Sequence, residues 1–555
     1  MHASPSAQAA VDGASAQSTP SGWSPLRYRD FRNWWLANLT SNVGSWMQTV
    51  AAQWLMVTLT SSAVLVGAIQ ATNLPVLVLA IPAGVLGDLL DRKRLIIAGQ
   101  SVMLLSALAL AVLDAVGAVT PIVLLILLCG IGVGQGLTGP IAQTLQPELV
   151  PAPERPQAIA LGSVNQNLAR AIGPAIGGLL LAATSAALVF FINSLSFLVV
   201  IGVVALVAVP KRVATLPREH FRSAARAGGR FVRNSPALRA LMVRAGAFGF
   251  FATGLWGLLP LVARRTLGLG SGGYGLLLGC VGVGAIVGAT FSPAIRRALS
   301  PRALMTICSA AIAVCAVVLG TSHSSIVDGI LLAFAGTAWI LALGLLNASF
   351  QSALPNWVKA RGMAYFTVVF QGATGTGALA LGAVAQATSI DTGLAVLGAG
   401  LVVGAIATLR LSLPAPGDID VTPADLMPVP DLPNVPVGPV LVTAEYDVAA
   451  GNERAFLARR DRLRHFRQRT GAFEWRMFID PEVPGRYVET FLVGSWEEHE
   501  RQHARETRQD SSLLDELNQL LVPGTSRVVH HYLAATEPSG AEPDAAPEVR
   551  SSLSS

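Results

Sequence analysis

A short charged segment between two long apolar runs constrains this chain more than any other feature. Residues 84–94 read Gly-Val-Leu-Gly-Asp-Leu-Leu-Asp-Arg-Lys-Arg, and apolar runs cover residues 65–86 and 95–112. Each run is long enough to cross a hydrocarbon layer of about 30 Å, which takes roughly 20 helical residues. Because the link is too short to fold by itself, the sequence predicts two antiparallel neighbouring helices in a membrane.

The composition agrees with a membrane protein. Apolar residues make up 52% of the chain, charged residues 13%, and the mean hydropathy is +0.54, all beyond the usual range of soluble domains. The four cysteines lie in apolar runs, which favours small core residues over disulfide partners. No pattern indicates a catalytic site, a metal centre or a cofactor, and no P-loop motif suggests direct ATP hydrolysis.

Apolar runs predict twelve membrane spans, and loop charge predicts their direction. Short loops rich in Lys and Arg mark the cytoplasmic face, and these loops alternate along the chain. We therefore expect a multi-pass protein of the inner (plasma) membrane with both termini in the cytoplasm. We attribute the net charge of +6 to the basic cytoplasmic loops and not to nucleic-acid binding. Arg264 and Arg265 are exceptions to this charge pattern, because they lie in a loop predicted on the outer side. The predicted spans are 34–58, 63–86, 95–116, 120–141, 157–181, 184–208, 239–263, 273–294, 303–321, 326–350, 363–388 and 391–412.

The chain repeats itself once. Arg155-Pro-Gln-Ala is followed ten residues later by Asn165, and Arg361-Gly-Met-Ala is followed ten residues later by Gln371. Two six-helix halves related in this way are typical of secondary transporters that bind substrate at the membrane midplane. The fold class predicted is an all-α membrane protein of two six-helix halves with a small C-terminal α+β domain. The expected parts are a disordered N-terminus (1–22), the first half (23–208), a basic cytoplasmic connector (209–238), the second half (239–413), a Pro-rich linker (414–439), a ferredoxin-like cytoplasmic domain (440–535) and a disordered tail (536–555).

The basic connector allows two interpretations. Arg218, Arg222, Arg226 and Arg230 recur every four residues, which gives one cationic helix face. A solvated charged face and a surface for anionic lipid headgroups account for this spacing equally well.

Polar residues inside the spans outline a candidate substrate path. A polar stripe at helical spacing runs along the first span, and such a stripe must face protein or water and not lipid. The alternative is hydrogen bonding between helices, which carries no transport role. For the stripe as a whole we favour cavity lining. Its members are Asn38, Asn42, Ser45, Thr49 and Gln53.

The fifth span contains a charge near the bilayer centre. Arg170 shares one helix face with Ser163 and Asn167, and a cation at this depth is a functional candidate by default. The alternative is a buried arginine bonded to backbone carbonyls. Gln371 is the polar position related to this helix by the repeat. Asn167, Arg170 and Gln371 complete the candidate path.

Two motifs resemble those of the major facilitator superfamily. Gly84, Asp88, Arg92 and Lys93 match the signature of its loop between helices 2 and 3, with Asp91 where glycine is common. Gly173, Pro174, Gly177 and Gly178 resemble the fifth-helix motif of facilitator antiporters, with Ala169 at the position of its first glycine. Glycines there allow close helix packing, and proline bends the helix. The resemblance implies that Asp88 and Arg92 gate the cytoplasmic face.

The resemblance extends to one branch of that superfamily. Ser41–Trp46, Pro82–Gly84 and the C-terminal residues 469–499 are similar to the transmembrane secretion effector group, which includes enterobactin-type siderophore exporters with antibiotic-biosynthesis-monooxygenase-like tails. It implies efflux of a small organic molecule by alternating access, with protons as the coupling ion. No Asp or Glu stands in mid-membrane to support proton coupling from the residues themselves.

The tail leaves two alternatives open. As a cofactor-independent monooxygenase it would make the protein bifunctional, with His499, His503, Trp475 and Trp496 lining a pocket. As a binding or assembly module it would dimerise through its sheet face and carry out no chemistry. Histidines and aromatics at helical spacing are more often packing residues, which favours the module. The identity of the cargo does not follow from the sequence.

Overall fold

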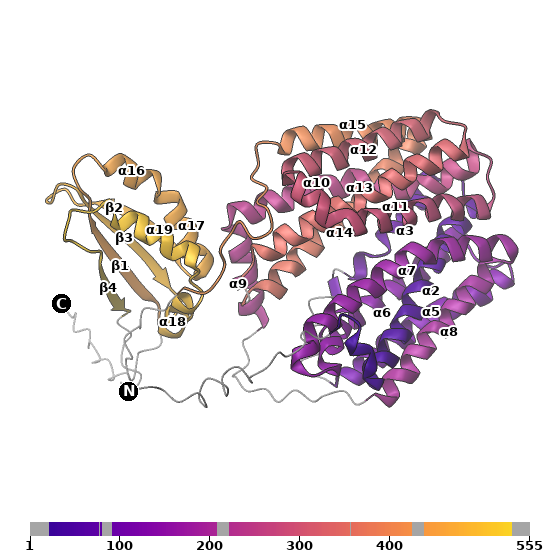
Figure 1. The fold of residues 1–555 in the computed structure, drawn as a ribbon, viewed down its shortest axis with the longest axis horizontal. Coiled ribbons are helices and arrows are strands. Elements are labelled where there is room, and N and C mark those ends of the chain that lie inside the picture. Colours follow the sequence, from indigo (N-terminus) through magenta and orange to yellow (C-terminus); the bar gives the residue numbers. More distant parts are fainter. Residues whose placement is uncertain are drawn as a thin grey trace, which may run out of the picture. The chain divides into compact units, whose positions relative to one another are not determined.

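The computed structural model in Figure 1 describes residues 21–76, 78–79, 91–207, 221–355, 357–424 and 438–534. The chain divides into two compact units. The helical unit comes from residues 1–221, 240–350 and 363–415, and the C-terminal unit from residues 222–239, 351–362 and 416–555. Segments that are far apart in sequence thus belong to the C-terminal unit.

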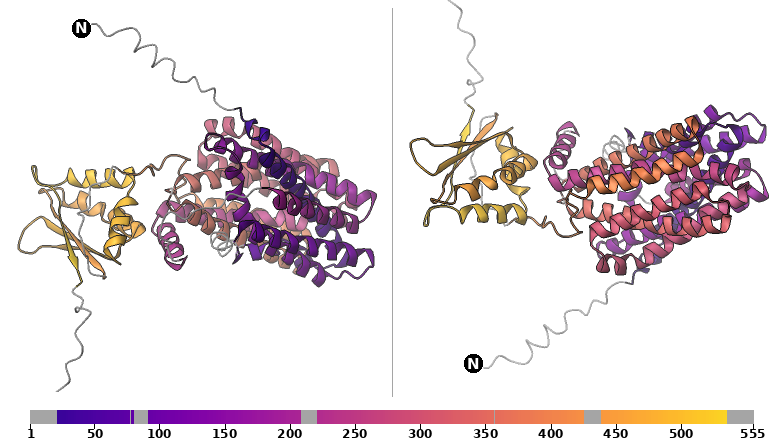
Figure 2. Two further views of the ribbon diagram at one scale, coloured as in Figure 1. Left: turned by 90° about the horizontal axis from the view of Figure 1, so that it is seen from below. Right: turned by 90° about the horizontal axis from the view of Figure 1, so that it is seen from above.

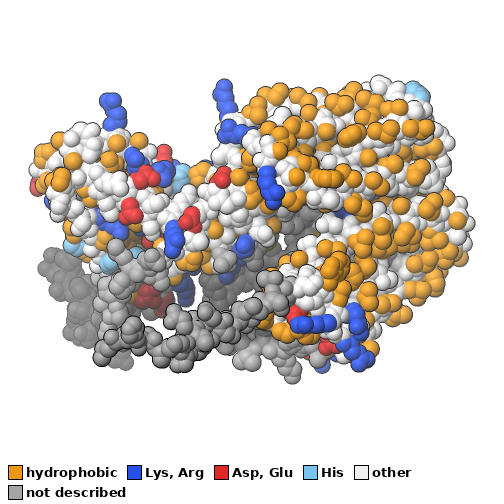
Figure 3. Space-filling view, viewed as in Figure 1, with side chains coloured by type: hydrophobic (Ala, Val, Ile, Leu, Met, Phe, Trp, Pro, Cys, Tyr) orange, Lys and Arg blue, Asp and Glu red, His pale blue; other side chains and the backbone are white. Residues whose placement is uncertain are grey.

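The helical unit contains the helices of the predicted spans. Among the described residues, nine helices are long and apolar enough to cross a membrane. Exposed apolar side chains cover the outward sides of helices such as α8 and α15 (Figure 3), as contact with lipid requires. The nine are α5 (Arg92–Ala115), α6 (Pro121–Leu145), α8 (Ala186–Leu206), α10 (Pro236–Leu261), α11 (Ser271–Ala298), α12 (Pro301–Thr321), α13 (Ser325–Ser352), α14 (Lys359–Ala387) and α15 (Ile390–Thr408).

Three other helices of this unit fall in predicted spans. The helices α2 (Arg29–Leu59) and α7 (Arg155–Ala183) are long but carry the polar stripe and the fifth-helix motif, so they do not count among the nine. The helix α3 (Ala63–Ala71) begins the second predicted span, whose later part lies outside the described residues. Short turns of helix connect these elements: η1 (Ser24–Arg27), η2 (Gln146–Leu149), η3 (Ala152–Glu154) and the π-helical η4 (Val262–Thr266).

Polar caps define where several helices begin. The Asp91 carboxylate accepts hydrogen bonds from the backbone N–H groups of Lys93 (2.9 Å) and Arg94 (3.2 Å), so aspartate in place of the usual glycine starts α5. Thr120 and Ser300 cap α6 and α12 in the same way, each followed by proline at the first helical position. These caps satisfy N–H groups that have no partner inside the helix.

The helix α7 packs closely between α2 and α11. A β-carbon on Gly173 would lie 2.5 Å from Trp46 Cβ, and one on Gly177 would lie 2.7 Å from the Met47 Cα of α2. On the other side, a β-carbon on Gly178 would lie 2.2 Å from the Cα of Gly275 in α11. The glycines of the fifth-helix motif therefore remove the side chains that would keep the three helices apart.

The C-terminal unit contains a four-stranded antiparallel sheet of order β2-β3-β1-β4. Its four helices lie on one face of the sheet (Figure 2), and a cluster including Val442, Phe456, Leu463 and Phe491 fills the space between them. The strands are β1 (Val440–Asp447), β2 (Phe473–Ile479), β3 (Arg486–Val493) and β4 (Val528–Leu533), and the helices are α16 (Glu453–Ala458), α17 (Arg460–Thr470), α18 (Trp496–Ala504) and α19 (Arg508–Asn518).

Two details of this unit differ from what its sequence predicts, which is one helix over 453–469 and a second over 496–521 that is broken near Asp510. The helix expected over 453–469 is two helices, which meet at Arg459. The break expected near Asp510 lies before it, because Thr507 and Asp510 form a reciprocal capping box that starts α19. The unit also includes α9 (Phe221–Arg233), from the basic connector.

The glycine contact between α7 and α11 gives a direct test. We expect Gly178→Ala to lower the apparent melting temperature of the detergent-solubilised protein, because the added carbon meets the backbone of Gly275 and backbone cannot move aside. Gly202→Ala in α8 is the matched control, since its added carbon meets nothing within 4 Å. Equal melting temperatures for the two variants would contradict the packing described here.

Candidate functional site

The polar stripe of α2 contributes first to a junction with α7. The Asn42 Nδ2 donates to Asn165 Oδ1 (2.8 Å), and the Asn165 Nδ2 donates to the backbone oxygen of Trp35 (2.8 Å). The Trp35 indole donates to the Leu161 oxygen (2.8 Å). This chain of bonds fixes α2 against α7 within the first half, so Asn42 matches the interpretation as a bond between helices.

A second junction joins α2 to α8. The Asn193 Nδ2 donates to Gln48 Oε1 (2.6 Å), and Ser196 bonds back to Asn193. All three side chains are buried. Gly44 faces this cluster, where a β-carbon would lie 2.3 Å from Asn193 Oδ1. Sequence reasoning missed Gln48 and Asn193, although both are polar residues inside apolar spans.

A third junction connects the two halves at the C-terminal end of α2. The Tyr274 hydroxyl of α11 donates to Gln53 Oε1, and the Tyr274 ring stacks on Trp54 at 5.8 Å. Both Gln53 and Tyr274 are buried. We call this end of the helical unit the Gln53 end.

Further bonds between the halves lie at the Gln53 end. Arg264 donates to the Val57 oxygen (2.7 Å) and Arg265 to the Ser61 oxygen (2.9 Å), while the Ser62 hydroxyl bonds the Gln386 side chain at 2.6 Å. The two arginines that broke the loop-charge pattern therefore satisfy carbonyls at the C-terminal end of α2 and in the turn that follows it.

The remaining stripe residues divide into two groups. Asn38 donates to the Trp34 oxygen and Thr49 to the Ser45 oxygen, both within α2 itself. The side chain of Ser45 has no hydrogen-bond partner among the described residues. Of the five predicted members, Ser45 alone keeps its side-chain hydrogen-bonding capacity free of protein partners in the described part of the chain.

Arg170 is held by an aromatic ring and not by an acid. Its guanidinium carbon lies 5.6 Å from the centre of the Trp46 ring of α2. Within the described ranges, no hydrogen bond or ion pair engages its five N–H donors. Ser163 and Asn167, on the same face of α7, are exposed, and neither side chain is bonded there. The structure therefore places a cation and two polar groups on one helix face, and none of the three has a hydrogen-bonding partner in the described part of the chain.

The second half contributes Gln371 beside an aromatic cluster. Gln371 of α14 is half-buried, and its side chain forms no hydrogen bond with the other described residues. The ring centre of the preceding residue, Phe370, lies 6.3 Å from that of Trp339. The Trp339 ring centre in turn lies 5.6 Å from that of Trp256 and 5.7 Å from that of Phe248. Sequence reasoning missed this cluster, which brings α10, α13 and α14 together.

The gating motif is described only in part. Gly84 and Asp88 lie outside the described residues. Arg92 forms an ion pair with Glu148 of η2 (3.0 Å), and Lys93 donates to the Ala205 oxygen of α8 (2.5 Å). Both contacts lie within the first half, where they tie the start of α5 to the ends of α6 and α8.

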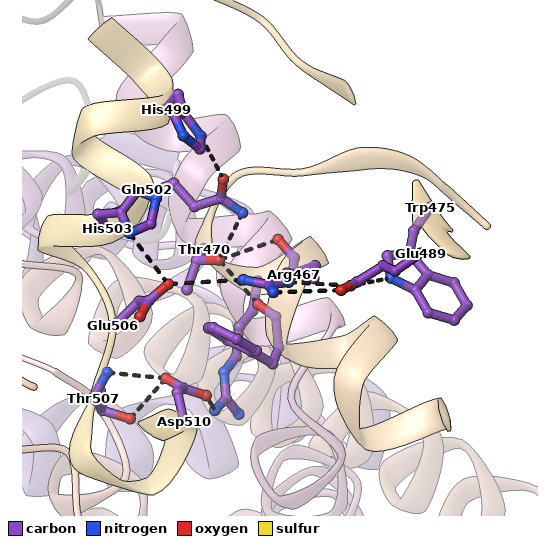
Figure 4. A network of polar contacts seen from close by, with 12 residues as sticks. Arg467, Thr470, Trp475, Glu489, His499, Gln502, His503, Glu506, Thr507 and Asp510 are labelled. Atoms are coloured by element: carbon purple, nitrogen blue, oxygen red, sulfur yellow. Dashed lines mark hydrogen bonds and ion pairs between the residues drawn. The ribbon is translucent and has the colours of Figure 1, made fainter. Parts of the chain in front are cut away.

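The C-terminal unit has a polar network through its core (Figure 4). Arg467 of α17 donates from Nε to Glu489 Oε1 (3.1 Å), and the same carboxylate accepts from Trp475 (2.7 Å) and Tyr446 (2.8 Å). Burial alone would lower the pKa of Arg467, but the negative charge of Glu489 raises it on balance. Glu489 is thus a buried carboxylate satisfied by three donors.

Three histidines and a tryptophan pack together at the α18 end of that network. The rings of His503 and His531 each lie 4.7 Å from the ring of His499, and Trp496 contacts both His499 and His531. The His499 Nε2 and Trp496 Nε1 atoms are buried without a partner in the described residues. Burial and the neighbouring histidines lower the pKa of His499 to about 3; burial and Arg467 lower that of His503 to about 4. We call these four residues the histidine cluster.

The residues proposed for an enzymatic pocket are therefore divided between two places. Trp475 bonds Glu489, whereas Trp496, His499 and His503 belong to the histidine cluster. Among the described residues, no group of three or more His, Cys, Asp and Glu could hold a metal ion.

Comparison with known proteins assigns the chain to a family. The model for the transmembrane secretion effector family matches residues 20–539. The chain belongs to this family. It is a membrane transporter of the major facilitator type, as its helical unit and the likeness to solved transporters also indicate.

Individual relatives are distant. The staphyloferrin A transporter of Staphylococcus aureus is 28% identical over 161 residues, which is 29% of this chain and 41% of that protein's length. A bacterial homologue of the human lysosomal transporter Spinster, solved in an inward-facing, unoccupied conformation, has a TM-score of 0.55 at 15% identity and covers 70% of this chain and 96% of its own. A D-xylose–proton symporter has a TM-score of 0.55 at 14% identity, with 71% and 99% covered. The two structures establish likeness of fold.

The histidine cluster predicts a pH-dependent stability of the C-terminal domain. Because the pKa of His499 is lower in the folded state than the ordinary value of about 6.5, the unfolded chain binds the extra proton, and stability falls as the pH drops below 6.5. For one such imidazole, the free energy of unfolding at pH 5 is lower than at neutral pH by about 2 kcal/mol. Glu506 opposes it, since burial raises the pKa of that carboxyl.

Urea unfolding of residues 438–534, expressed as a separate domain, measures this effect at pH 7 and pH 5. His499→Phe keeps an aromatic ring but removes the titrating group. The difference in the free energy of unfolding between pH 7 and pH 5 should therefore shrink by about 2 kcal/mol. His530→Phe is the control, because His530 is exposed on the other face of the sheet. The same pH dependence of stability in His499→Phe and in the unaltered domain would refute the lowered pKa of His499 as its cause.

Proposed function

We propose that this protein exports a small organic molecule across the inner membrane by alternating access. The observation that carries the proposal is the free polar surface of Ser163, Asn167 and Arg170 on α7, a helix that packs tightly on both halves. Ser45 and Gln371 add unbonded polar groups from α2 and α14. Substrate binding between two halves is how transporters with repeated six-helix halves work.

We assign the Gln53 end to the outer face and both termini to the cytoplasm. The loop-charge pattern supports this orientation, with α2, α3 and α7 completing twelve spans alongside the nine apolar helices. The bonds of Tyr274, Arg264 and Arg265 join the halves at the Gln53 end. We therefore infer that the arrangement is inward-facing, with the outer end closed.

We propose a gating role for the loop motif and protons as the coupling ion, both on the family resemblance. Arg92 and its partner Glu148 support the gate, because their ion pair connects two cytoplasmic loops of the first half. In this scheme Gly84 and Asp88 complete the motif.

The cargo that fits Arg170 best is anionic or catechol-like. Arg170 is a permanent cation with a planar array of donors, and oxygen acceptors on a substrate would satisfy them bidentately. A staphyloferrin A transporter among the relatives is consistent with a siderophore as cargo. Drugs and secondary metabolites that carry carboxylate or catechol groups belong to the same chemical class.

Export from cells tests the function and the role of Arg170 together. Cells with the protein should retain less of an anionic or catechol compound than cells without it, across a chemically varied panel. We expect Arg170→Met to abolish that difference and Arg170→Lys to reduce it, since lysine keeps the charge but loses the planar fork. Membrane insertion, followed by the amount of protein in the membrane fraction, should be unchanged. Wild-type export by Arg170→Met would show that the residue is structural.

For the C-terminal domain we propose a ferredoxin-like assembly module. Its strand order and its β-α-β-β-α-β sequence of elements support the fold. The sheet face opposite the helices is apolar and exposed at Phe473, Phe478 and Tyr532, and this supports pairing with the same face of a second copy. Phe478→Lys should shift residues 438–534 from dimer to monomer in light scattering; a monomeric unaltered domain would refute the pairing.

A further inference from the structure

A small pocket lies where three helices of the second half meet near their ends. Side chains of α10, α12 and α15 line it, among them Arg244, Ser309 and Thr408, and its volume is about 10 Å³. That space holds about one water-sized group. Because α10 begins and α15 ends here, the pocket is at the opposite end of the helical unit from the Gln53 end, where Arg264 follows α10. We call it the Arg244 pocket.

Arg244 uses only part of its guanidinium group for the fold. Its Nη2 donates to the backbone oxygens of Thr408 and Leu411, the second at 3.1 Å, and so caps the end of α15. Its Nε is buried and, like its Nη1, has no hydrogen-bonding partner among the described residues. Arg244 is 3% exposed, and a buried donor without an acceptor costs free energy. The pocket thus contains a cation with donors to spare.

The helix α12 adds a second donor and a second cation. Ser309 is buried and lines the pocket, and its hydroxyl forms no hydrogen bond with the other described residues. Arg302, exposed in the first turn of α12, is close enough to Arg244 for the two positive charges to repel each other. An anion bound between them would relieve that repulsion.

No carboxylate of the second half compensates this charge. Residues 240–415 contain two acidic residues, Asp328 and Asp391. They stand in the first turns of α13 and α15 and therefore at the other ends of those helices. Among the described residues, neither Arg244 nor Arg302 forms an ion pair. The charge and the free donors of the pocket thus fit an anion that is not part of the chain.

The surface beside the pocket is apolar and exposed. Val403 and Ile406 of α15 and Ile307 of α12 are all exposed, and each is next in sequence to a residue that lines the pocket. In a membrane such side chains contact acyl chains. An anion that carries acyl chains therefore matches both the pocket and its surroundings, whereas a free anion matches the pocket alone.

We propose that the Arg244 pocket binds the phosphate group of an anionic phospholipid. A phosphate oxygen accepts hydrogen bonds from Arg244 and Ser309, Arg302 adds positive charge beside it, and the acyl chains lie along α12 and α15. In the orientation proposed above, the pocket faces the cytoplasmic leaflet, where anionic lipids bind basic pockets between helices. The inference uses that orientation and depends neither on the cargo nor on export.

Lipid binding to the delipidated full-length protein in detergent tests this inference. Native mass spectrometry with added phosphatidylglycerol gives the dissociation constant of the first lipid bound. Arg302→Gln removes a charge and Ser309→Ala removes a donor, so each should raise that constant several-fold. Both variants leave the bonds of Arg244 to the end of α15 in place. Phosphatidylcholine, which has no net charge, and inorganic phosphate, which has no acyl chain, should bind the unaltered protein several-fold more weakly.

Arg94→Gln is the matched control. Arg94 is exposed in the first turn of α5, as Arg302 is in α12, and forms no ion pair within the described part of the chain. The variant therefore loses the same charge at the same predicted membrane face but in the first half, and its dissociation constant should not change.

Three results would overturn the proposal. The first is one dissociation constant for the unaltered protein, Arg302→Gln and Ser309→Ala. The second is an equal loss in Arg94→Gln, which would indicate unspecific attraction of anionic lipid. The third is inorganic phosphate binding as tightly as phosphatidylglycerol, which would make the pocket a site for a free anion. Since the assay involves no transport, none of these results would bear on the proposed export.

Discussion

The packing of α7 against α2 and α11 determines how the rest of the helical unit is arranged. Lipid tails are as apolar as the helices, so burial of apolar surface does not drive helices together in a membrane. Close contact must instead come from small residues such as Gly178 and Gly275, whose backbones touch. Hydrogen bonds between helices, such as Asn42 to Asn165 and Tyr274 to Gln53, then fix their rotation. Because α7 carries the motif glycines and Arg170, its packing also decides where that cation lies.

Much of the fold follows from local patterns in the sequence. Apolar length predicts the spans, since a helix in lipid must satisfy every backbone group by itself. The alternation of apolar and polar residues from Val442 to Asp447 marks a strand, and β1 indeed buries every second side chain. The α2 and α7 helices were predicted from apolar length like the other spans, although their polar residues keep them out of the nine most apolar helices of the described chain. The break before Asp510 was misplaced by a few residues, since a capping box depends on backbone geometry as well as on residue type.

The partners of the site residues could not be predicted in the same way. Asn42 and Asn165 are 123 residues apart, Gln53 and Tyr274 are 221 apart, and Arg230 and Glu498 are 268 apart. Such pairs form because packing places two surfaces together, and a single sequence carries no record of that placement. The stripe on α2 therefore read as one cavity lining, whereas its members differ: Asn42 and Gln53 bond to other helices, and Ser45 does not.

Arg170 shows how a magnitude can separate structure from function. An arginine at the centre of a membrane helix costs between about 2.5 and 3.5 kcal/mol on insertion scales. A cation over a tryptophan ring returns on the order of 1–2 kcal/mol, depending on how far the pair is desolvated. The contact with Trp46 thus offsets only part of the cost. Among the described residues, the N–H donors of Arg170 have no hydrogen-bonding partner. In the transport mechanism proposed above, water or cargo satisfies those donors, and unpaired donors would then discriminate against molecules that lack acceptor oxygens. This difference is why we propose a binding role for Arg170 and not for Arg264 and Arg265, whose side chains donate to backbone oxygens of Val57 and Ser61.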